Sequence, residues 1–194
     1  DMKCLLQDMD VLNKRVIVRC DFNVPLKDGH ILDDTKIKAS LETINYLIEK
    51  NCKIILLSHM GKVKTLEDKK KYSLKVVAER LNELVSSNVI FSPETRSSLL
   101  EIKAMELQPK DILLVENTRF EDIDNGFESN DDMQLASYFA SLGDIFVLDA
   151  FASAHRKHAS TYGITKFIPS CLGFLVQREM EMLNKYVLNA PRPF

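Results

Sequence analysis

The sequence contains no tryptophan, only six glycines and six prolines among its 194 residues, and no long apolar run. The scarcity and scatter of glycine and proline exclude a collagen-like or low-complexity chain. No apolar stretch approaches the roughly 18 residues of a membrane span, and nothing at the given N-terminus resembles the charged and apolar regions of a secretory leader. We therefore expect a cytoplasmic chain that does not bind a membrane.

An excess of charge of either sign is also lacking. The 26 lysines and arginines are offset by 28 acidic residues, which leaves a formal net charge of −2. Such a chain is not built to coat nucleic acid or an anionic surface, so any basic site must be local. With 45% hydrophobic and 28% charged residues, the composition is that of a globular protein, and the length suits one domain.

Motifs for metals and nucleotides are absent as well. The four cysteines are scattered without C-x-x-C pairing, which predicts structural thiols and no metal site (Cys4, Cys20, Cys52 and Cys171). Neither the G-x-x-x-x-G-K-[ST] loop nor the G-x-G-x-x-G fingerprint occurs. We expect no cofactor-binding residues in this chain.

The chain does contain a regular alternation of two hydrophobic patterns. Short aliphatic runs predict strands at 15–19, 53–57, 89–91, 112–115 and 145–148, and most are apolar throughout, as buried parallel strands are. Helical spacing lies between or after them, in four groups: Ile37, Leu41, Ile44 and Ile48; Leu74, Val77, Leu81 and Leu84; Asp131 or Asp132 through Leu135 and Phe139; and Val176, Met180, Leu183 and Val187. This order predicts an α/β fold with a doubly wound parallel sheet in a three-layer αβα, Rossmann-like arrangement.

The end of the sequence predicts a domain boundary. Two prolines follow the last helical pattern in Asn189-Ala190-Pro191-Arg192-Pro193-Phe194, and proline cannot continue a helix. We therefore assign residues 1–185 to one domain and residues 186–194 to the start of a linker.

Polar and mostly basic residues follow the predicted strands. In open α/β sheets the ligand lies beyond the carboxyl ends of the strands, so these loops are expected to meet. Their donors suit a small, multiply charged anion, and the acidic and amide groups suit a ligand with a hydroxyl. The residues expected to converge are Asp21, Asn23, His59, Lys62, Arg119, His155, Arg156 and His158.

Structural roles compete for some of these residues. Asp21 is in a position typical of a turn-forming side chain, and Arg119 has Glu116 and Glu121 as candidate ion-pair partners. The mixed-charge segment 62–71 is typical of a solvated loop, apart from Lys62 next to the strand end. Only the coincidence of four loops favours a binding site.

Four segments resemble the substrate-binding segments of the phosphoglycerate kinase family: V-R-C-D-F-N-V-P, L-L-S-H-M-G-K, L-V-E-N-T-R-F and D-A-F-A-S-A-H-R-K-H-A-S. The resemblance runs from about Val16 to the C-terminus but covers only the N-terminal half of that two-domain enzyme. It implies a glycolytic phosphotransferase that moves a phosphoryl group between 1,3-bisphosphoglycerate and ADP, giving 3-phosphoglycerate and ATP. In this family the N-terminal domain binds the glycerate, and the C-terminal domain, absent here, binds Mg-ATP or Mg-ADP.

The resemblance also implies residue roles. Lys36 takes the position of the catalytic arginine, and His155 and His158 take the remaining histidine positions of the family's basic patch. The implied substrate-binding residues are Asp21, Asn23, Lys36, His59, Lys62, Arg119 and Arg156. The implied partner is the chain's own C-terminal domain, and we expect a monomer that is inactive alone.

Three departures from the family pattern stand out. The family's D-D-T-R-I reads D-D-T-K-I here, so Lys36 keeps the charge but loses the guanidinium fork. The family's S-H-L-G-R reads S-H-M-G-K, which places Lys62 where an arginine would grip phosphate. Ala152 and Ser153 replace a glycine and a threonine, which adds bulk where glycine permits close approach.

Two alternatives stay open at this stage. A non-catalytic module could use the same basic residues to bind an anion, which the Lys36 substitution favours. An unrelated doubly wound domain, such as a receiver-like module, would need clustered acids at the strand ends, whereas these strand ends are mainly basic.

Overall fold

A computed structural model describes residues 4–189. Its centre is a six-stranded parallel sheet in the order β5-β6-β4-β1-β7-β8. The strands are β1 (Arg15–Arg19), β4 (Lys53–Leu57), β5 (Val89–Ser92), β6 (Ile112–Val115), β7 (Ile145–Leu148) and β8 (Ser170–Leu172). After β1 the chain builds one side of the sheet and then crosses to the other side at β7. The predicted doubly wound parallel sheet is confirmed, and its strand order reverses beside β1.

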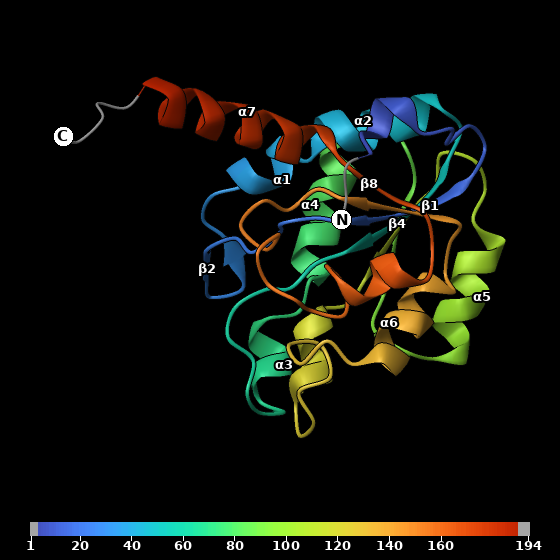
Figure 1. Cartoon of the computed structure of the whole chain (residues 1–194). Coiled ribbons are helices and arrows are strands. Elements are labelled where there is room, and N and C mark those ends of the chain that lie inside the picture. Colours follow the sequence, from blue (N-terminus) through green and yellow to red (C-terminus); the bar gives the residue numbers. More distant parts are fainter. Residues whose placement is uncertain (1–3, 190–194) are drawn as a thin grey trace.

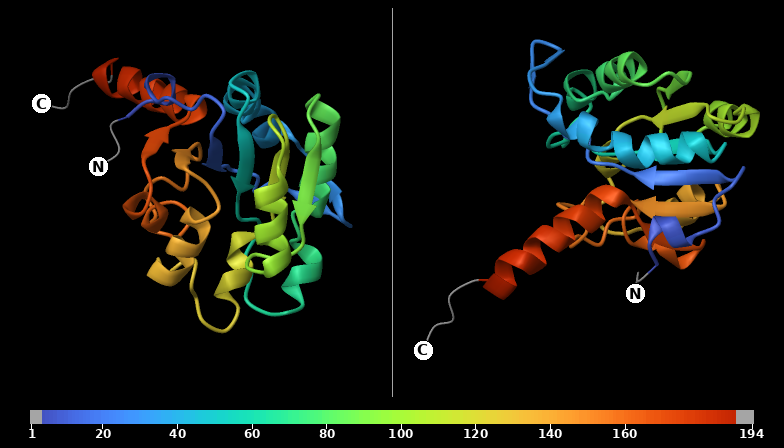
Figure 2. Two further views of the ribbon diagram at one scale, coloured as in Figure 1. Left: turned by 90° about the vertical axis from the view of Figure 1, so that its right-hand side faces the viewer. Right: turned by 90° about the horizontal axis from the view of Figure 1, so that it is seen from above.

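Helices cover both faces of the sheet (Figure 1 and Figure 2). Alternate strand residues divide between two cores, so that Val16 and Val18 belong to one and Ile17 belongs to the other. The first core includes residues of α1 (Thr35–Ala39), α2 (Leu41–Glu49) and α4 (Lys75–Leu84), and the second includes residues of α5 (Ser98–Glu106), α6 (Met133–Ala140) and η3 (Gly163–Lys166). The three-layer arrangement follows from this division.

Local chemistry explains where several helices begin and end. The predicted start of the third helix at Asp131 or Asp132 is confirmed, because Asp132 caps α6 by accepting a hydrogen bond from Leu135 N at 2.9 Å. The single helix predicted over Ile37 to Ile48 is wrong. It is divided at Ser40, whose hydroxyl donates to Ile37 O at 2.6 Å and ends the first segment.

Several short elements were not predicted. They are η1 (Leu6–Asp8), the hairpin of β2 (Leu26–Lys27) and β3 (His30–Ile31), the helix α3 (Asp68–Lys71), η2 (Thr118–Asp122), and also α5, η3 and β8. The segment 62–71, expected to be a loop, therefore contains one helical turn, all of it solvent-accessible.

The last described helix, α7 (Phe174–Asn189), extends away from the sheet (Figure 1). Val176 is buried in the second core, whereas Met180, Leu183 and Val187 are exposed. The helix runs through the boundary placed between residues 185 and 186, which stays a prediction, and residues 190–194 of the expected linker lie outside the described residues. No helix within residues 4–189 is long and apolar enough to cross a membrane.

Candidate anion-binding site

A cavity of about 470 Å³ lies where the segments after β1, β4, β6 and β7 meet. All seven residues expected to bind substrate line it, together with four others. The lining residues are Asp21, Asn23, Lys36, His59, Gly61, Lys62, Tyr72, Arg119, Ala152, Ser153 and Arg156. The convergence of four loops that the sequence predicted is therefore present in the structure.

The loop after β1 has both a structural and a potential binding role. Asp21 Oδ1 accepts a hydrogen bond from Asn23 N at 3.1 Å, which is the turn considered as the alternative for this residue. Asp21 Oδ2 lies 3.4 Å from Lys36 Nζ, and Lys36 also donates to Asn23 O at 3.1 Å. The turn thus holds its free carboxylate oxygen beside the lysine of α1, at the wall of the cavity.

The loop after β4 is tied to the first loop by its backbone. Gly61 N donates to Asn23 Oδ1 at 2.9 Å, and the φ of Gly61 is 64°, a conformation that side chains disfavour. A Cβ atom at Gly61 would lie 2.3 Å from the Tyr72 ring. Glycine is therefore required here both by the backbone conformation and by the close approach of Tyr72.

Asn117 holds the third wall of the cavity in place. This fully buried amide accepts from Met60 N at 3.2 Å and Arg119 N at 3.0 Å, and it donates to Met60 O at 2.8 Å and Tyr72 O at 2.9 Å. All four hydrogen-bonding positions of the side chain are used. Asn117 therefore positions the backbone of three cavity segments without lining the cavity itself.

Neither glutamate considered as a partner of Arg119 fills that role. Glu116 accepts from Ser73 Oγ at 2.6 Å and from Leu74 N and Asn117 N at 2.8 Å, and Glu121 forms a bidentate pair with Arg96. The nearest carboxylate to the Arg119 guanidinium is Asp122, at 4.0 Å from Nε. Arg119 is therefore not neutralised by a close ion pair with either glutamate.

Charge at the cavity is predominantly positive, but His59 does not contribute to it. Lys36, Lys62, Arg119 and Arg156 face one carboxylate, that of Asp21. Burial, and then the positive charge of Arg19, lowers the pKa of His59 to about 2, so the imidazole is neutral at physiological pH. The site offers four cationic groups and one neutral ring to an anion.

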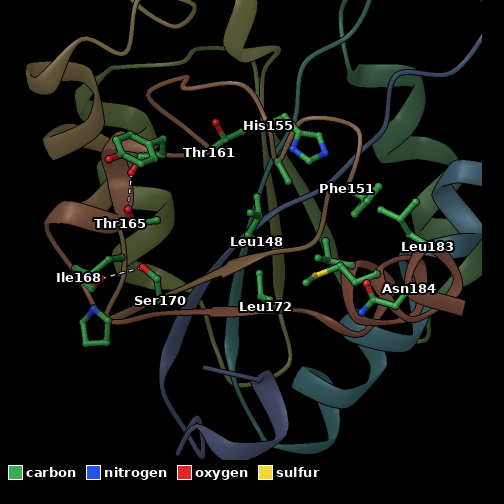
Figure 3. Close-up of a pocket in the computed structure, with 15 residues that line it drawn as sticks. Leu148, Phe151, His155, Thr161, Thr165, Ile168, Ser170, Leu172, Leu183 and Asn184 are labelled. Atoms are coloured by element: carbon green, nitrogen blue, oxygen red, sulfur yellow. Dashed lines mark hydrogen bonds between the residues drawn. The ribbon is translucent and has the colours of Figure 1, made fainter. Parts of the chain in front are cut away.

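The two remaining histidines do not line this cavity. His155 lies in a second cavity of about 610 Å³, against the Phe151 ring at a centroid distance of 5.6 Å, so its expected convergence with the basic residues is wrong (Figure 3). The backbone turns through 151–156, so that His155 lines the second cavity while Arg156 lines the first. His158 is buried, its Nδ1 has no hydrogen-bond partner among residues 4–189, and burial lowers the pKa of its ring.

Arg19 is a residue that the sequence reading passed over. It ends β1, is fully buried, and donates from Nη2 to the ring of His59 at 2.9 Å. The only indication in the sequence was a charged residue that directly follows the apolar centre of a strand. An arginine is almost never fully buried without partners.

The described residues hold no preformed cluster of metal ligands. Among residues 4–189 no group of three or more histidine, cysteine or acidic side chains could hold a metal ion. Among the described residues that line the cavity, Asp21 has the one carboxylate, and a single carboxylate holds Mg²⁺ only together with water and the phosphate oxygens of a ligand.

A cavity at the carboxyl ends of parallel strands is where α/β domains commonly bind ligands, and the positive charge of this cavity suits a small anion. The family model "Phosphoglycerate kinase" matches residues 6–194. The chain is 50% identical to the phosphoglycerate kinase of Macrococcus caseolyticus, covering 100% of this chain and 49% of that one. It is 52% identical to that of Listeria innocua, covering 98% of this chain and 48% of that one.

Solved structures agree with these sequence matches. The phosphoglycerate kinase of Coxiella burnetii superposes with a TM-score of 0.81 at 35% identity, covering 97% of this chain and 46% of that one. The phosphoglycerate kinase of Pyrococcus horikoshii gives a TM-score of 0.84 at 31% identity, and the match covers 98% of this chain and 47% of that one. The chain belongs to the phosphoglycerate kinase family and corresponds to its N-terminal half. It spans about half the length of these relatives.

Proposed function

We propose that this chain is the glycerate-binding half of a phosphoglycerate kinase and that the cavity takes 3-phosphoglycerate or 1,3-bisphosphoglycerate. One observation carries the proposal: seven residues, from the four loops after β1, β4, β6 and β7 and from α1, line one cavity of about 470 Å³. Mg-ATP or Mg-ADP would be bound by a C-terminal domain outside this chain, as the resemblance to the family implies.

The residues that line the cavity have different roles in binding a phosphorylated glycerate. Lys62, Arg119 and Arg156 supply charge-assisted hydrogen bonds for the phosphate. Asp21 and Asn23 supply an acceptor and an amide for the hydroxyl and carboxyl groups. His59 completes the set as a neutral hydrogen-bond donor.

Lys36 is the residue proposed to act on the transferring phosphoryl group. Phosphoryl transfer depends on positioning and on stabilisation of charge rather than on covalent help from the protein. Lys36 holds its ammonium between Asp21 and Asn23 O, at the wall of the cavity. Closure of a second domain over this wall would exclude water and align the donor with the bound glycerate.

Calorimetric titration with 3-phosphoglycerate, at low and moderate salt, tests the proposal. We expect saturable binding that weakens with salt, is lost in Arg156→Ala, and persists in Lys157→Ala, whose ammonium lies 4.9 Å from the Tyr162 ring and not at the cavity. ATP serves as a second ligand and is expected to give no response. Absence of glycerate binding by the folded chain contradicts the proposal.

A non-catalytic anion-binding module is the second candidate. The Lys36–Asp21 ion pair favours it, because a lysine lacks the fork of the family's arginine and is already engaged with a carboxylate. Turnover assays decide between the two after this chain is joined to the C-terminal half of one of its relatives. Turnover supports the kinase, whereas glycerate binding without turnover supports the binding module.

A further inference from the structure

Arg19 is the most deeply buried cation beside the cavity. Its side chain is fully buried at the end of β1, and it does not line the cavity. Nε donates to Ser160 Oγ at 2.9 Å, Nη1 donates to Cys20 O, and Nη2 lies 2.9 Å from His59 Nδ1. Each nitrogen of the guanidinium therefore has a partner inside the protein.

The chemistry of arginine fixes the direction of these hydrogen bonds. A guanidinium has donors and no acceptor, so His59 Nδ1 must present its lone pair to Arg19. The proton of a neutral His59 must then sit on Nε2. A second proton on Nδ1 would oppose the N–H of Arg19, so the charged imidazolium is disfavoured.

On its other side Arg19 connects to a buried carboxylate. Ser160 Oγ accepts from Arg19 Nε, and it donates its own proton to Glu128 Oε2 at 2.5 Å. Ser160 N donates to Glu128 Oε1 at 2.9 Å. Glu128 is fully buried, and its carboxyl group partly offsets the lowering of the Arg19 pKa that burial causes. The hydroxyl of Ser160 therefore connects two buried side chains, those of Arg19 and Glu128.

We propose that Glu128, Ser160 and Arg19 form a buried relay that holds His59 as the neutral Nε2–H tautomer, making His59 an oriented hydrogen-bond donor to the anion. Arg19, Ser160 and Glu128 are then positioning residues, since they act through His59. The inference deepens the proposed function, because it assigns a tautomer and a support to one of its binding residues.

The surroundings of His59 agree with a neutral ring. Burial and the nearby positive charges hold the pKa of His59 far below its ordinary value, at about 2. The titratable and charged groups around it come from every segment at the cavity: Arg19, Asp21, Lys36, Lys62, Arg119, Arg156 and His158. Cations predominate among them, so anion affinity should not change with the protonation of His59 between pH 5 and 8.

Nitrogen NMR of the ¹⁵N-histidine-labelled chain tests the relay without any ligand. His59→Gln assigns the resonances. In the unmodified chain we expect the Nε2–H tautomer and no titration of His59 between pH 5 and 8. A titrating ring, or the Nδ1–H tautomer, overturns the proposal.

Ser160→Ala tests the support of the tautomer. Loss of the hydroxyl separates Arg19 from Glu128, so we expect His59 to show mixed tautomers or a titration above pH 5, and 3-phosphoglycerate binding to weaken roughly three- to tenfold. Ser160→Thr retains the hydroxyl and should restore both readouts. Thr165→Ala is the matched control, since its hydroxyl donates only to the nearby Tyr162 O. Unchanged His59 resonances in folded Ser160→Ala overturn the relay.

The two hypotheses can fail separately. The NMR spectrum reports the tautomer in the free chain, while the glycerate titration reports the ligand. An Nε2–H tautomer that depends on Ser160, found together with no response to 3-phosphoglycerate, retains the relay and contradicts the proposed function. Inorganic phosphate then serves as the anion whose affinity is compared between the chain and Ser160→Ala, and equal affinities contradict the role of His59 as donor.

Discussion

Asn23 accepts the backbone N–H of Gly61 through Oδ1 at 2.9 Å, and this hydrogen bond joins the loop after β1 to the loop after β4. The backbone of Asn23 is held as well, because its N–H donates to Asp21 Oδ1 and its carbonyl accepts from Lys36 Nζ. The side chain of Asn23 therefore lines the cavity in a fixed orientation. Because the amide group is planar, the bond to Oδ1 also fixes the direction of Nδ2. Preorganisation of this kind reduces the entropy lost when a ligand is bound.

Substitution of Gly61 should disrupt this junction. Gly61→Ala adds a Cβ atom 2.3 Å from Tyr72 at a φ of +64°, so we expect both backbone strain and overpacking, together costing roughly 2–5 kcal/mol of unfolding free energy. Gly29→Ala is the matched control, because its φ is +77° but no atom lies within 4 Å of the added Cβ. Urea unfolding measures both. Equal losses in the two variants would show that the contact with Tyr72 costs nothing.

Replacement of the Asn117 amide by a carboxylate should lower the unfolding free energy strongly, although the two side chains have nearly the same size. Asn117→Asp replaces the donor to Met60 O and Tyr72 O with a carboxylate oxygen, and a buried charge facing two carbonyl groups is expected to cost at least roughly 3 kcal/mol. Asn45→Asp, at an exposed position of α2, is the control. Urea unfolding at neutral pH checks the difference, and a loss no larger than that of the control contradicts the assigned role.

Restoring the family's arginine at position 36 should raise activity. One charge-assisted hydrogen bond is worth roughly 1.5–3 kcal/mol, so Lys36→Arg should raise kcat at least roughly tenfold in a two-domain protein that joins this chain to a relative's C-terminal half. Lys38→Arg is the control, since Lys38 pairs with Asp34 at 3.6 Å and does not line the cavity. An unchanged kcat in Lys36→Arg would show that residue 36 does not stabilise the transferring phosphoryl group in the transition state.

The buried carboxyl of Asp149 should make stability depend on pH. Burial raises the pKa of Asp149 from 3.8 to about 7, so the folded chain holds a proton that the unfolded chain releases. The resulting stabilisation is fully present below about pH 4 and is lost as pH rises through about 7, amounting to as much as roughly 4 kcal/mol. Asp149→Asn should flatten the dependence of unfolding free energy on pH between 4 and 8.

Exposed Asp10→Asn is the control for that measurement, since its side chain is 79% accessible. The two variants are compared by how steeply the unfolding free energy changes with pH and not by its absolute value. Asp149 Oδ2 has no hydrogen-bond partner in the described part of the chain, so an amide there would bury an unpaired donor. An unchanged slope in Asp149→Asn would assign the pH dependence to other groups.

The strong hydrophobic runs made the main sheet predictable. The five predicted strands are each four or five residues long in the structure, and all but β5 are almost wholly buried, so their apolar composition separated them from helices. β8 was missed because three residues, Ser170 to Leu172, make no recognisable run. The break at Ser40 was missed because hydrophobic spacing continues across it, while a side-chain hydrogen bond to the backbone ends the helix.

The site was predictable to the extent that it depends on strand ends. Residues directly after strands, such as Asp21, His59 and Arg119, line the cavity because parallel strands bring their carboxyl ends together. His155 lies deeper in its loop, where local turns decide the direction of each side chain, and strand position carries no information about those turns. Arg19 was missed because its partner Ser160 lies 141 positions away in the sequence.

The central place of β1 has a consequence for the order in which the protein can be made. Val16 pairs with Ile54 on one side and with Ile145 on the other. The second edge of β1 is therefore covered only after most of the chain has been synthesised. Pairings this distant in sequence slow folding and leave strand edges exposed in intermediates. During synthesis the cavity therefore cannot be complete until β7 and Arg156 have emerged from the ribosome, and until then the second edge of β1 is uncovered.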